Sequence, residues 1–127
     1  MQLLLIMSQY SKENMNLEYK TKGNNVVIYL KESLDIANSA YIERNISSLI
    51  SQYTEHDVVL NMDEVKYMNS AGLGVLIILT KSLEKRERTL KISNLNYTLR
   101  KVINILDAET LVNIYDDEKD AILALNK

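Results

Sequence analysis

Polar and apolar residues alternate over residues 17–21, Leu-Glu-Tyr-Lys-Thr, which is typical of a strand with one buried face. The next residues, Lys-Gly-Asn-Asn at 22–25, favour a tight turn, and the apolar run at 26–30 has the composition of a buried strand. Residues 17–30 are therefore predicted to form a β-hairpin.

A helical period replaces this alternation after the loop 31–35. The apolar stripe that shows it consists of Ile42, Ile46, Leu49, Ile50 and Tyr53. This spacing predicts an amphipathic helix of about four turns. Asn38 or Ser39 has the short polar side chain expected of its N-cap.

The middle of the chain repeats this order of strand and helix. The apolar run at 58–60 predicts a third strand, the polar loop 61–69 follows it, and the next predicted helix extends from residue 70 to about residue 88. Residues 89–92 have the composition of another short strand. Strands joined through single helices are expected to pair in parallel.

The last part of the chain predicts two more helices and one more strand. Asn96 is the expected cap of a helix whose apolar stripe is formed by Leu99, Val102, Ile103 and Leu106. Residues 111–115 predict an edge strand. Asp116 or Asp117 is expected to cap a final helix that carries Ala121, Ile122 and Leu125.

Together these elements predict a single α/β domain with a mixed sheet of four or five strands and three or four helices. A length of 127 residues, with 46% hydrophobic residues, suits one domain with a core of its own. Residues 15–127 are assigned to this domain, and residues 1–14 are expected to be an N-terminal extension that borders the first strand. The apolar run at 3–7 is too short to cross a bilayer, so no direct membrane insertion is expected.

The formal net charge of −2 provides no overall positive field, and nucleic acid is therefore not an expected partner. The absence of cysteine excludes disulfides, thiol nucleophiles and zinc-thiolate sites, and it fits a reducing compartment such as the cytoplasm. Partners must be predicted from local features, and the oligomeric state is left open.

The segment Met68–Leu79, M-N-S-A-G-L-G-V-L-I-I-L, holds two of the three glycines of the chain. Each glycine costs about 1 kcal/mol of helix propensity relative to alanine. Ser70 is expected in the first helical turn, where free N–H groups and the helix dipole favour a negative charge such as a phosphate. Gly72 and Gly74 would then give a kinase or another partner access to the hydroxyl. Alternatively, Asn69 or Ser70 is only a helix cap, and the glycines serve tight internal packing.

This segment resembles the signature of the STAS-domain family, and within it that of the anti-sigma factor antagonists (anti-anti-sigma factors). The pattern is an apolar strand and then a loop that ends M-D-S-[SA]-G-L-G before an apolar helix. Here Val58–Asp63 and Tyr67–Gly74 match it in order and spacing. The resemblance extends through the order of elements from about residue 17 to residue 125.

The resemblance implies a protein that is not an enzyme and needs no cofactor. Unphosphorylated, it would bind an anti-sigma factor, typically a serine kinase, and so release a sigma factor. Phosphorylation at Ser70 would end that binding, and a separate phosphatase would reset it. The residues expected to contact the partner are Asp35, Asn69, Ala71, Gly72, Leu73 and Gly74.

Two positions depart from the family pattern. Glu32 stands where the family tends to have glycine, and Asn69 stands where the residue before the acceptor is usually aspartate. Asn69 either slows phosphorylation, if the carboxylate helps to orient the hydroxyl, or makes the phosphate easier to accommodate, because one like charge is removed. The first possibility motivates a different function, in which the chain is a STAS subunit that docks in a larger assembly and is never phosphorylated.

Catalytic alternatives find little support in the residues. Ser70 lacks the first glycine of a nucleophile elbow, and His56, the single histidine, is expected at the surface. Asp63 follows a strand as a receiver-type phospho-acceptor would. That type of site also needs an acidic pair to hold magnesium, and Leu30-Lys31-Glu32, after the apolar strand, does not supply one. The acids at 116–118 are interpreted as residues of a first helical turn, and no metal is expected.

Overall fold

The computed structural model describes residues 17–124, which form a five-stranded mixed sheet with helices on both faces. The strands are β1 (Glu18–Lys22), β2 (Asn25–Tyr29), β3 (Asp57–Asn61), β4 (Leu90–Ser93) and β5 (Ile114–Tyr115). They lie side by side in chain order, with β1 antiparallel to β2 and the remaining neighbours parallel. The predicted hairpin and the predicted parallel pairing are confirmed.

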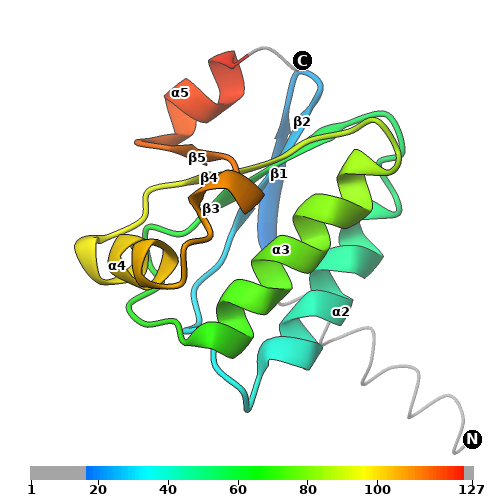
Figure 1. Cartoon of the computed structure of the whole chain (residues 1–127). Coiled ribbons are helices and arrows are strands. Elements are labelled where there is room, and N and C mark those ends of the chain that lie inside the picture. The colour runs from blue at the N-terminus through cyan, green and yellow to red at the C-terminus, as the bar shows by residue number, and fades with distance from the viewer. Residues whose placement is uncertain (1–16, 125–127) are drawn as a thin grey trace, which may run out of the picture.

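Three helices cover one face of the sheet and one short helix covers the other (Figure 1). The first three are α2 (Ser39–Ile50), α3 (Ser70–Glu84) and α4 (Tyr97–Ile105), and α5 (Glu118–Leu123) lies on the opposite face. A 3₁₀ turn, η1 (Glu109–Leu111), precedes β5. The predicted class, a single α/β domain with a mixed sheet, is confirmed.

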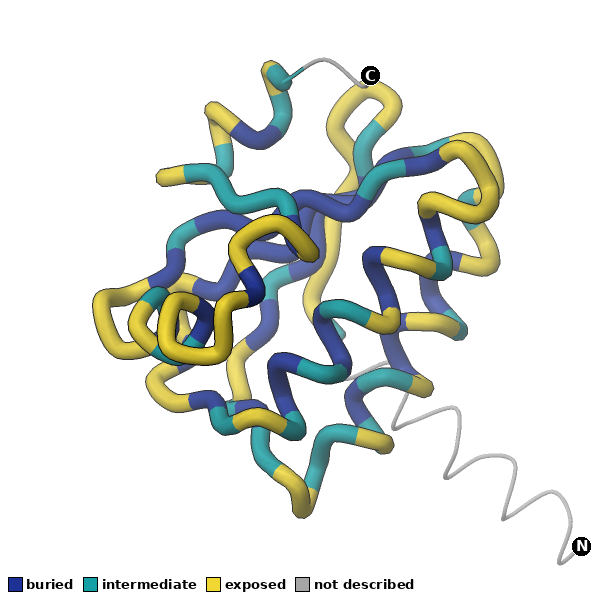
Figure 2. Tube along the Cα trace, viewed as in Figure 1, coloured by how far each residue is buried: buried dark blue, intermediate teal, exposed yellow. Residues whose placement is uncertain are grey.

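Period-two alternation in the strands divides the apolar residues between these two faces. Val26 and Ile28 point into the large core beneath α2, α3 and α4, while Val27 belongs to a small cluster with Val59 and Ala121 of α5. Figure 2 shows the central strands as an almost continuous buried layer. Burial on both faces explains why β2 and β3 have continuous apolar runs.

Two helices end earlier than the sequence predicts. The helix α2 ends at Ile50, and Tyr53, predicted in its apolar stripe, lies in the following turn. The helix predicted to reach Arg88 ends at Glu84, because Glu87 adopts a left-handed backbone conformation with φ of 59° and the Arg88 N–H donates to the Leu83 carbonyl at 2.9 Å. No glycine or proline marks either end in the sequence.

The last predicted strand was also too long. Of residues 111–115, only Ile114 and Tyr115 pair with β4, since Leu111 closes the 3₁₀ turn by donating its N–H to the Ala108 carbonyl at 3.0 Å. Among the predicted caps, Asn96 accepts from the N–H of Leu99 at 2.8 Å. Asp117, and not Asp116, caps α5, and Leu125 lies outside the described residues.

The carboxylate of Glu118 fastens α5 to the sheet. It accepts from Lys22 Nζ and from Asn61 Nδ2, each at 3.0 Å. Burial alone would raise the pKa of Glu118, but hydrogen bonds from Asn61, Lys22 and Tyr29 outweigh it and lower the pKa. Burial and the same carboxylate raise the pKa of Tyr29 to about 12. This cluster joins β1, β2, β3 and α5.

His56 is half-buried and does not lie at the open surface that the sequence predicts. Its ring packs edge-on against Tyr53 with centroids 5.3 Å apart, and its carbonyl accepts from Nε of Arg88. Arg88 also donates to the Tyr53 carbonyl at 2.7 Å and is itself buried. These contacts give His56 a place in the packing between α2 and β3.

Candidate functional site

Ser70 is the first residue of α3 and is exposed. The preceding residue, Asn69, has an extended backbone, and its Oδ1 accepts from the N–H groups of Ala71 at 3.0 Å and Gly72 at 3.3 Å. Asn69 is therefore the N-cap that the simpler interpretation of the motif expects. This cap fixes the backbone at the start of α3, where Ser70 is exposed.

The N-terminal end of α3 has no acidic residue in its first turn. The positive end of the helix dipole is therefore not neutralised by the helix's own side chains. A phosphoserine at Ser70 would bring a charge of about −1.5 to −2 next to this end, where the dipole favours it by about 0.3 to 1 kcal/mol. The end of α3 is therefore electrostatically compatible with a negative charge at Ser70.

A second loop lies against the α3 end. Leu34, from the loop after β2, forms an isolated parallel bridge with Met68. The Leu34 N–H donates to the carbonyl of Tyr67 at 3.0 Å, and the Asn69 N–H donates to the Leu34 carbonyl at 3.2 Å. This pairing joins the loop after β2 to the loop after β3, at the carboxyl ends of the two strands.

The two glycines of the motif have different surroundings. A Cβ on Gly72 would lie 2.5 Å from Leu34 Cβ and 2.6 Å from the Leu34 carbonyl oxygen, so Gly72 is needed for contact with the chain's own loop. A Cβ on Gly74 would meet no atom within 4 Å. Internal packing accounts for Gly72, and only Gly74 is left as the glycine that opens α3 toward solvent.

Asp35 shapes the loop that Leu34 anchors. Its Oδ1 accepts from the N–H groups of Ala37 at 2.9 Å and Asn38 at 3.1 Å, and Asn38 Oδ1 accepts in return from the Asp35 N–H at 3.0 Å. Asn38 thus stabilises the loop and makes no side-chain hydrogen bond to cap α2. The loop presents Ile36, whose exposed fraction is 82%.

Three exposed apolar side chains lie on α3 or on the two loops that meet at its N-terminal end. Ile36 precedes α2, Tyr67 lies three residues before Ser70, and Ile78 lies two turns further along α3. The residues Ala71 and Gly74 are partly exposed between them, whereas Gly72 and Leu73 are buried. We call the set Ile36, Tyr67, Ser70, Ala71, Gly74 and Ile78 the α3 surface.

The sequence identified three members of the α3 surface, Ser70, Ala71 and Gly74, but missed Ile36, Tyr67 and Ile78. Leu73 was expected to contact a partner, yet its side chain belongs to the large core. Asp35 and Asn69 lie beside the surface and organise its backbone through the hydrogen bonds given above. The pattern Asp-x-x-Asn at 35–38, which produces an Asx-type turn, is the signal that could have indicated Ile36 as the tip of a tight loop.

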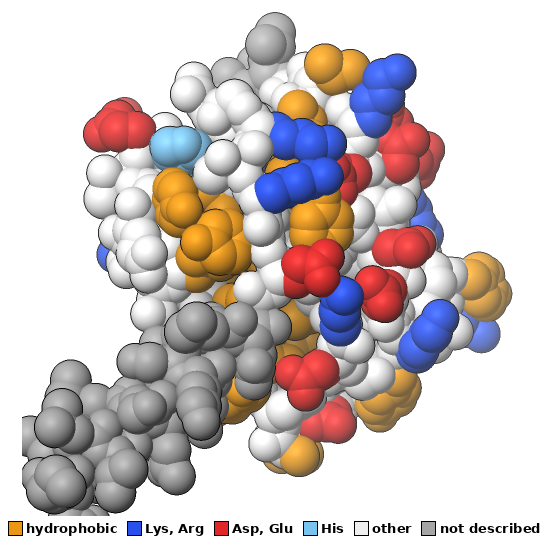
Figure 3. Space-filling model, turned by 180° about the vertical axis from the view of Figure 1, so that it is seen from behind, with side chains coloured by type: hydrophobic (Ala, Val, Ile, Leu, Met, Phe, Trp, Pro, Cys, Tyr) orange, Lys and Arg blue, Asp and Glu red, His pale blue; other side chains and the backbone are white. Residues whose placement is uncertain are grey.

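The acidic residues considered for other chemistry have structural roles. Asp116 forms an ion pair with Arg100 at 2.9 Å, Asp117 caps α5, and Asp63 is an exposed residue of the turn after β3. Within residues 17–124 no cluster of three or more His, Cys, Asp or Glu side chains is arranged to hold a metal ion. On the face shown in Figure 3, acidic and basic side chains are interspersed.

A family model described as the STAS domain matches residues 16–121 of this chain. The chain belongs to the STAS-domain family. The anti-sigma-B factor antagonist of Bacillus subtilis is 25% identical over 101 residues, which cover 80% of this chain and 91% of that protein. The predicted family is confirmed.

None of the helices within residues 17–124 has the length and apolar character needed to span a membrane.

Solved structures of STAS-domain proteins share the fold. The anti-sigma factor antagonist SpoIIAA in its unphosphorylated form aligns with a TM-score of 0.67 at 24% identity, covering 84% of this chain and 92% of that chain. The Bacillus SpoIIAA in its phosphorylated form aligns with a TM-score of 0.60 at 24% identity, covering 84% of this chain and 96% of that chain. The same fold thus occurs in a relative described with and without a phosphate.

Proposed function

We propose that this STAS domain is an anti-sigma factor antagonist that binds an anti-sigma factor through the α3 surface and releases it when Ser70 is phosphorylated. The observation that carries the proposal is the position of Ser70, exposed on a helix end without acidic residues, with exposed Ile36, Tyr67 and Ile78 on the same helix and its two adjoining loops. The partner would be a serine kinase of the cytoplasm, and a phosphatase would restore the hydroxyl. The protein is then a substrate and a binding partner, and it catalyses no reaction of its own.

The physical basis of release is a change of charge within an apolar contact. A partner that packs on Ile36, Ile78 and the open backbone at Gly74 excludes water around Ser70. A phosphate of charge about −1.5 to −2 would then be buried against that partner, which is costly. The fold itself tolerates the phosphate, because the α3 N-terminus remains solvated in the free protein.

Gly74 supports a partner on this surface. The residue lies within α3, where glycine costs about 1 kcal/mol relative to alanine, and no atom of the described chain occupies the space of its missing side chain. A backbone or side chain of another protein in that space would account for the glycine.

The experiment is an incubation of the protein with candidate anti-sigma kinases and ATP, followed by mapping of phosphate by mass spectrometry. Label is expected at Ser70 and is expected to disappear in Ser70→Ala but not in Ser47→Ala, which alters an exposed helical serine of α2. Ser70→Asp is expected to weaken the complex at least tenfold, while Ser70→Ala retains it.

Equal affinity of Ser70→Asp and Ser70→Ala for every kinase tested would contradict the switch. Stable binding to transporter or assembly subunits, without phosphate at Ser70, would instead favour the docking function that Asn69 suggested from the sequence.

A further inference from the structure

The outer strand β1 has one partner within residues 17–124, the strand β2. All five of its residues are exposed. It contains no proline, and its register with β2 has no bulge. An edge of this kind presents unpaired N–H and C=O groups that can template another strand.

The backbone groups on the free edge of β1 belong to its odd-numbered residues. The Leu30 N–H donates to Asn61 and the Asn24 carbonyl accepts from Asp57, so the even-numbered residues of β2 face β3. The odd-numbered residues of β2 therefore bond to β1, through Lys22, Lys20 and Glu18 in the observed register. The N–H and C=O groups of Tyr19 and Thr21 are left pointing away from the sheet.

Side chains divide the same strand into a charged face and a face that carries an aromatic ring. Lys20 and Lys22 reach toward Glu118 on the α5 face, with nitrogen–oxygen distances of 3.9 and 3.0 Å. Glu18 lies on that same face by the alternation of the strand, and it forms an ion pair with Lys31 of its own chain at 2.7 Å. Tyr19 lies on the opposite face, where its ring packs edge-on against Tyr53 with centroids 6.0 Å apart.

Among the registers centred on residues 18–21, charge favours one for pairing with a second copy. With Tyr19 opposite Tyr19 of the second copy, Glu18 lies opposite Lys20 in both halves of an antiparallel pair, and unlike charges face each other twice. Centring the pair on Glu18 or on Lys20 would place like charges directly opposite. Centring it on Thr21 would place Lys20 opposite Lys22.

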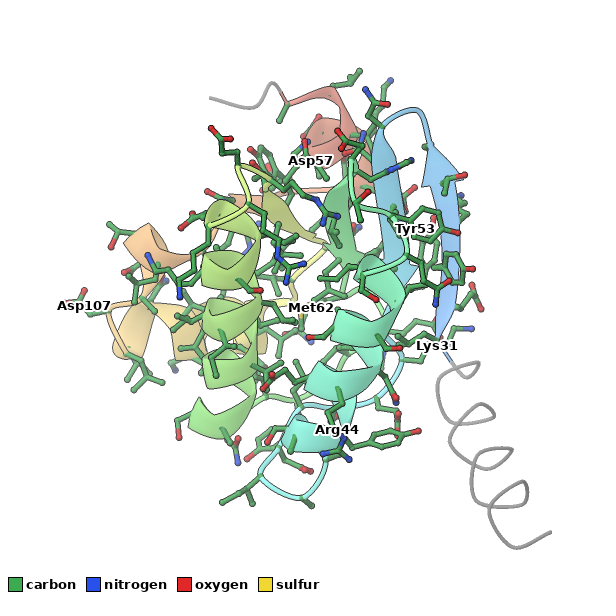
Figure 4. The ribbon with its side chains drawn as sticks, turned by 90° about the vertical axis from the view of Figure 1, so that its right-hand side faces the viewer. Lys31, Arg44, Tyr53, Asp57, Met62 and Asp107 are labelled. Atoms are coloured by element: carbon green, nitrogen blue, oxygen red, sulfur yellow. The ribbon has the colours of Figure 1, made fainter. Side chains whose placement is uncertain are left out.

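We propose that two copies of this chain pair antiparallel through β1 about Tyr19, so that their sheets form one continuous sheet across a two-fold axis. This interface is independent of the proposed function. Figure 4 shows β1 and α3 on either side of α2, so helix α3 lies away from the paired edge.

The first test is the mass of the full-length protein in solution, measured by sedimentation equilibrium over a range of concentrations. A dimer is expected. Glu18→Lys replaces two unlike pairs across the interface by two like pairs, besides removing the ion pair with Lys31, and is expected to weaken dimerisation about tenfold. Adding Lys20→Glu to Glu18→Lys is expected to restore it, whereas Glu84→Lys, an exposed charge reversal on α3, is expected to have no effect.

The second test examines the register with single cysteines, which the chain otherwise lacks. Directly opposite Cα atoms in such a pair are about 5.5 Å apart, within the range of a disulfide, so Tyr19→Cys is expected to form covalent dimers on oxidation. The Thr21 residues of the two copies would be separated by roughly 13 Å along the strands, so Thr21→Cys is the matched control that should not form them.

A protein that stays monomeric throughout the concentration range, with its native circular dichroism spectrum, would overturn the proposal, because another segment of the same chain or solvent then occupies the edge. Cross-linking of Thr21→Cys as readily as Tyr19→Cys would also overturn it, because the register would then be wrong.

Discussion

The backbone of Leu34 fills the space that a side chain on Gly72 would require. A Cβ on Gly72 would lie 2.6 Å from the Leu34 carbonyl oxygen. Gly74, two residues further along α3 and therefore on the opposite side of the helix, has open space instead. Substitution of the two glycines by alanine is therefore expected to change the stability of the fold in opposite directions.

Gly72→Ala is expected to destabilise the fold by about 1 to 3 kcal/mol, because the loop at Leu34 must move to admit a methyl group. Gly74→Ala is expected to stabilise it by about 0.5 to 1 kcal/mol, through helix propensity alone. Urea unfolding of both variants measures the difference. If Gly72→Ala proved as stable as the wild type, Leu34 would not be the reason for the glycine.

Asn69 is expected to lower the cost of a negative charge at Ser70. Asn69→Asp keeps an oxygen that can accept from the N–H groups of Ala71 and Gly72, but it adds a carboxylate next to the acceptor. The phosphomimic Ser70→Asp should therefore cost about 0.5 kcal/mol more in the Asn69→Asp background than alone, a difference that a double-mutant cycle by urea unfolding can measure. Additive effects of the two substitutions would contradict this role. Asn69→Ala serves as the control for capping and should cost about 1 kcal/mol.

Ile36 is expected to contribute to binding and not to folding. Ile36→Ser removes a side chain that is 82% exposed, so the free energy of unfolding should change by less than about 0.5 kcal/mol. The affinity for the anti-sigma factor should fall at least tenfold, or about 1.4 kcal/mol, by titration calorimetry. The matched control is Ile105→Ser, which alters another exposed isoleucine, on α4, and should retain full affinity. An equal loss in both variants would show that the α3 surface is not the contact.

The attachment of α5 is expected to weaken in acid. The pKa of Glu118 is lowered in the fold by its hydrogen bonds, so the unfolded chain binds the proton more tightly and the stabilisation is present above the ordinary glutamate pKa. It is lost as the pH falls through the lowered pKa of the folded state. Glu118→Gln should cost about 1 to 3 kcal/mol near pH 7, and this cost should shrink below about pH 4.

Urea unfolding at a series of pH values measures this dependence. Lys22→Met removes one hydrogen-bond donor to the carboxylate and should show a smaller change of the same sign. A cost of Glu118→Gln that stays constant from neutral pH to about pH 3 would contradict the assignment.

Local patterns were sufficient for most of the fold, because each element carries its own period. The hairpin was predictable from alternation and from Gly23, which adopts a positive φ of 58° in the turn. The end of α3 was not predictable, since a non-glycine residue, Glu87, takes the left-handed conformation there and the buried side chain of Arg88 anchors the next segment. Such an ending depends on contacts with residues more than thirty positions away.

The same distinction applies to the site. Ser70 and its cap could be predicted because a helix start is a local feature. The reason for Gly72 could not, since it depends on Leu34, which the chain folds back from 38 positions earlier. Lys91 shows the same limit: it is almost fully buried, with its Nζ 3.3 Å from the Ala124 carbonyl, and nothing in its own strand indicates that α5 covers it.

The contrast between the two glycines also bears on how such a sequence drifts over generations. Gly72 is constrained by the protein's own loop, so a copy of the gene that no longer served any regulatory circuit would still have to keep it. Gly74 is constrained by nothing within the described chain. If a lineage lost the protein that binds the α3 surface, selection for helix stability alone would favour replacement of Gly74. A homologue without this glycine would then be expected not to bind such a partner.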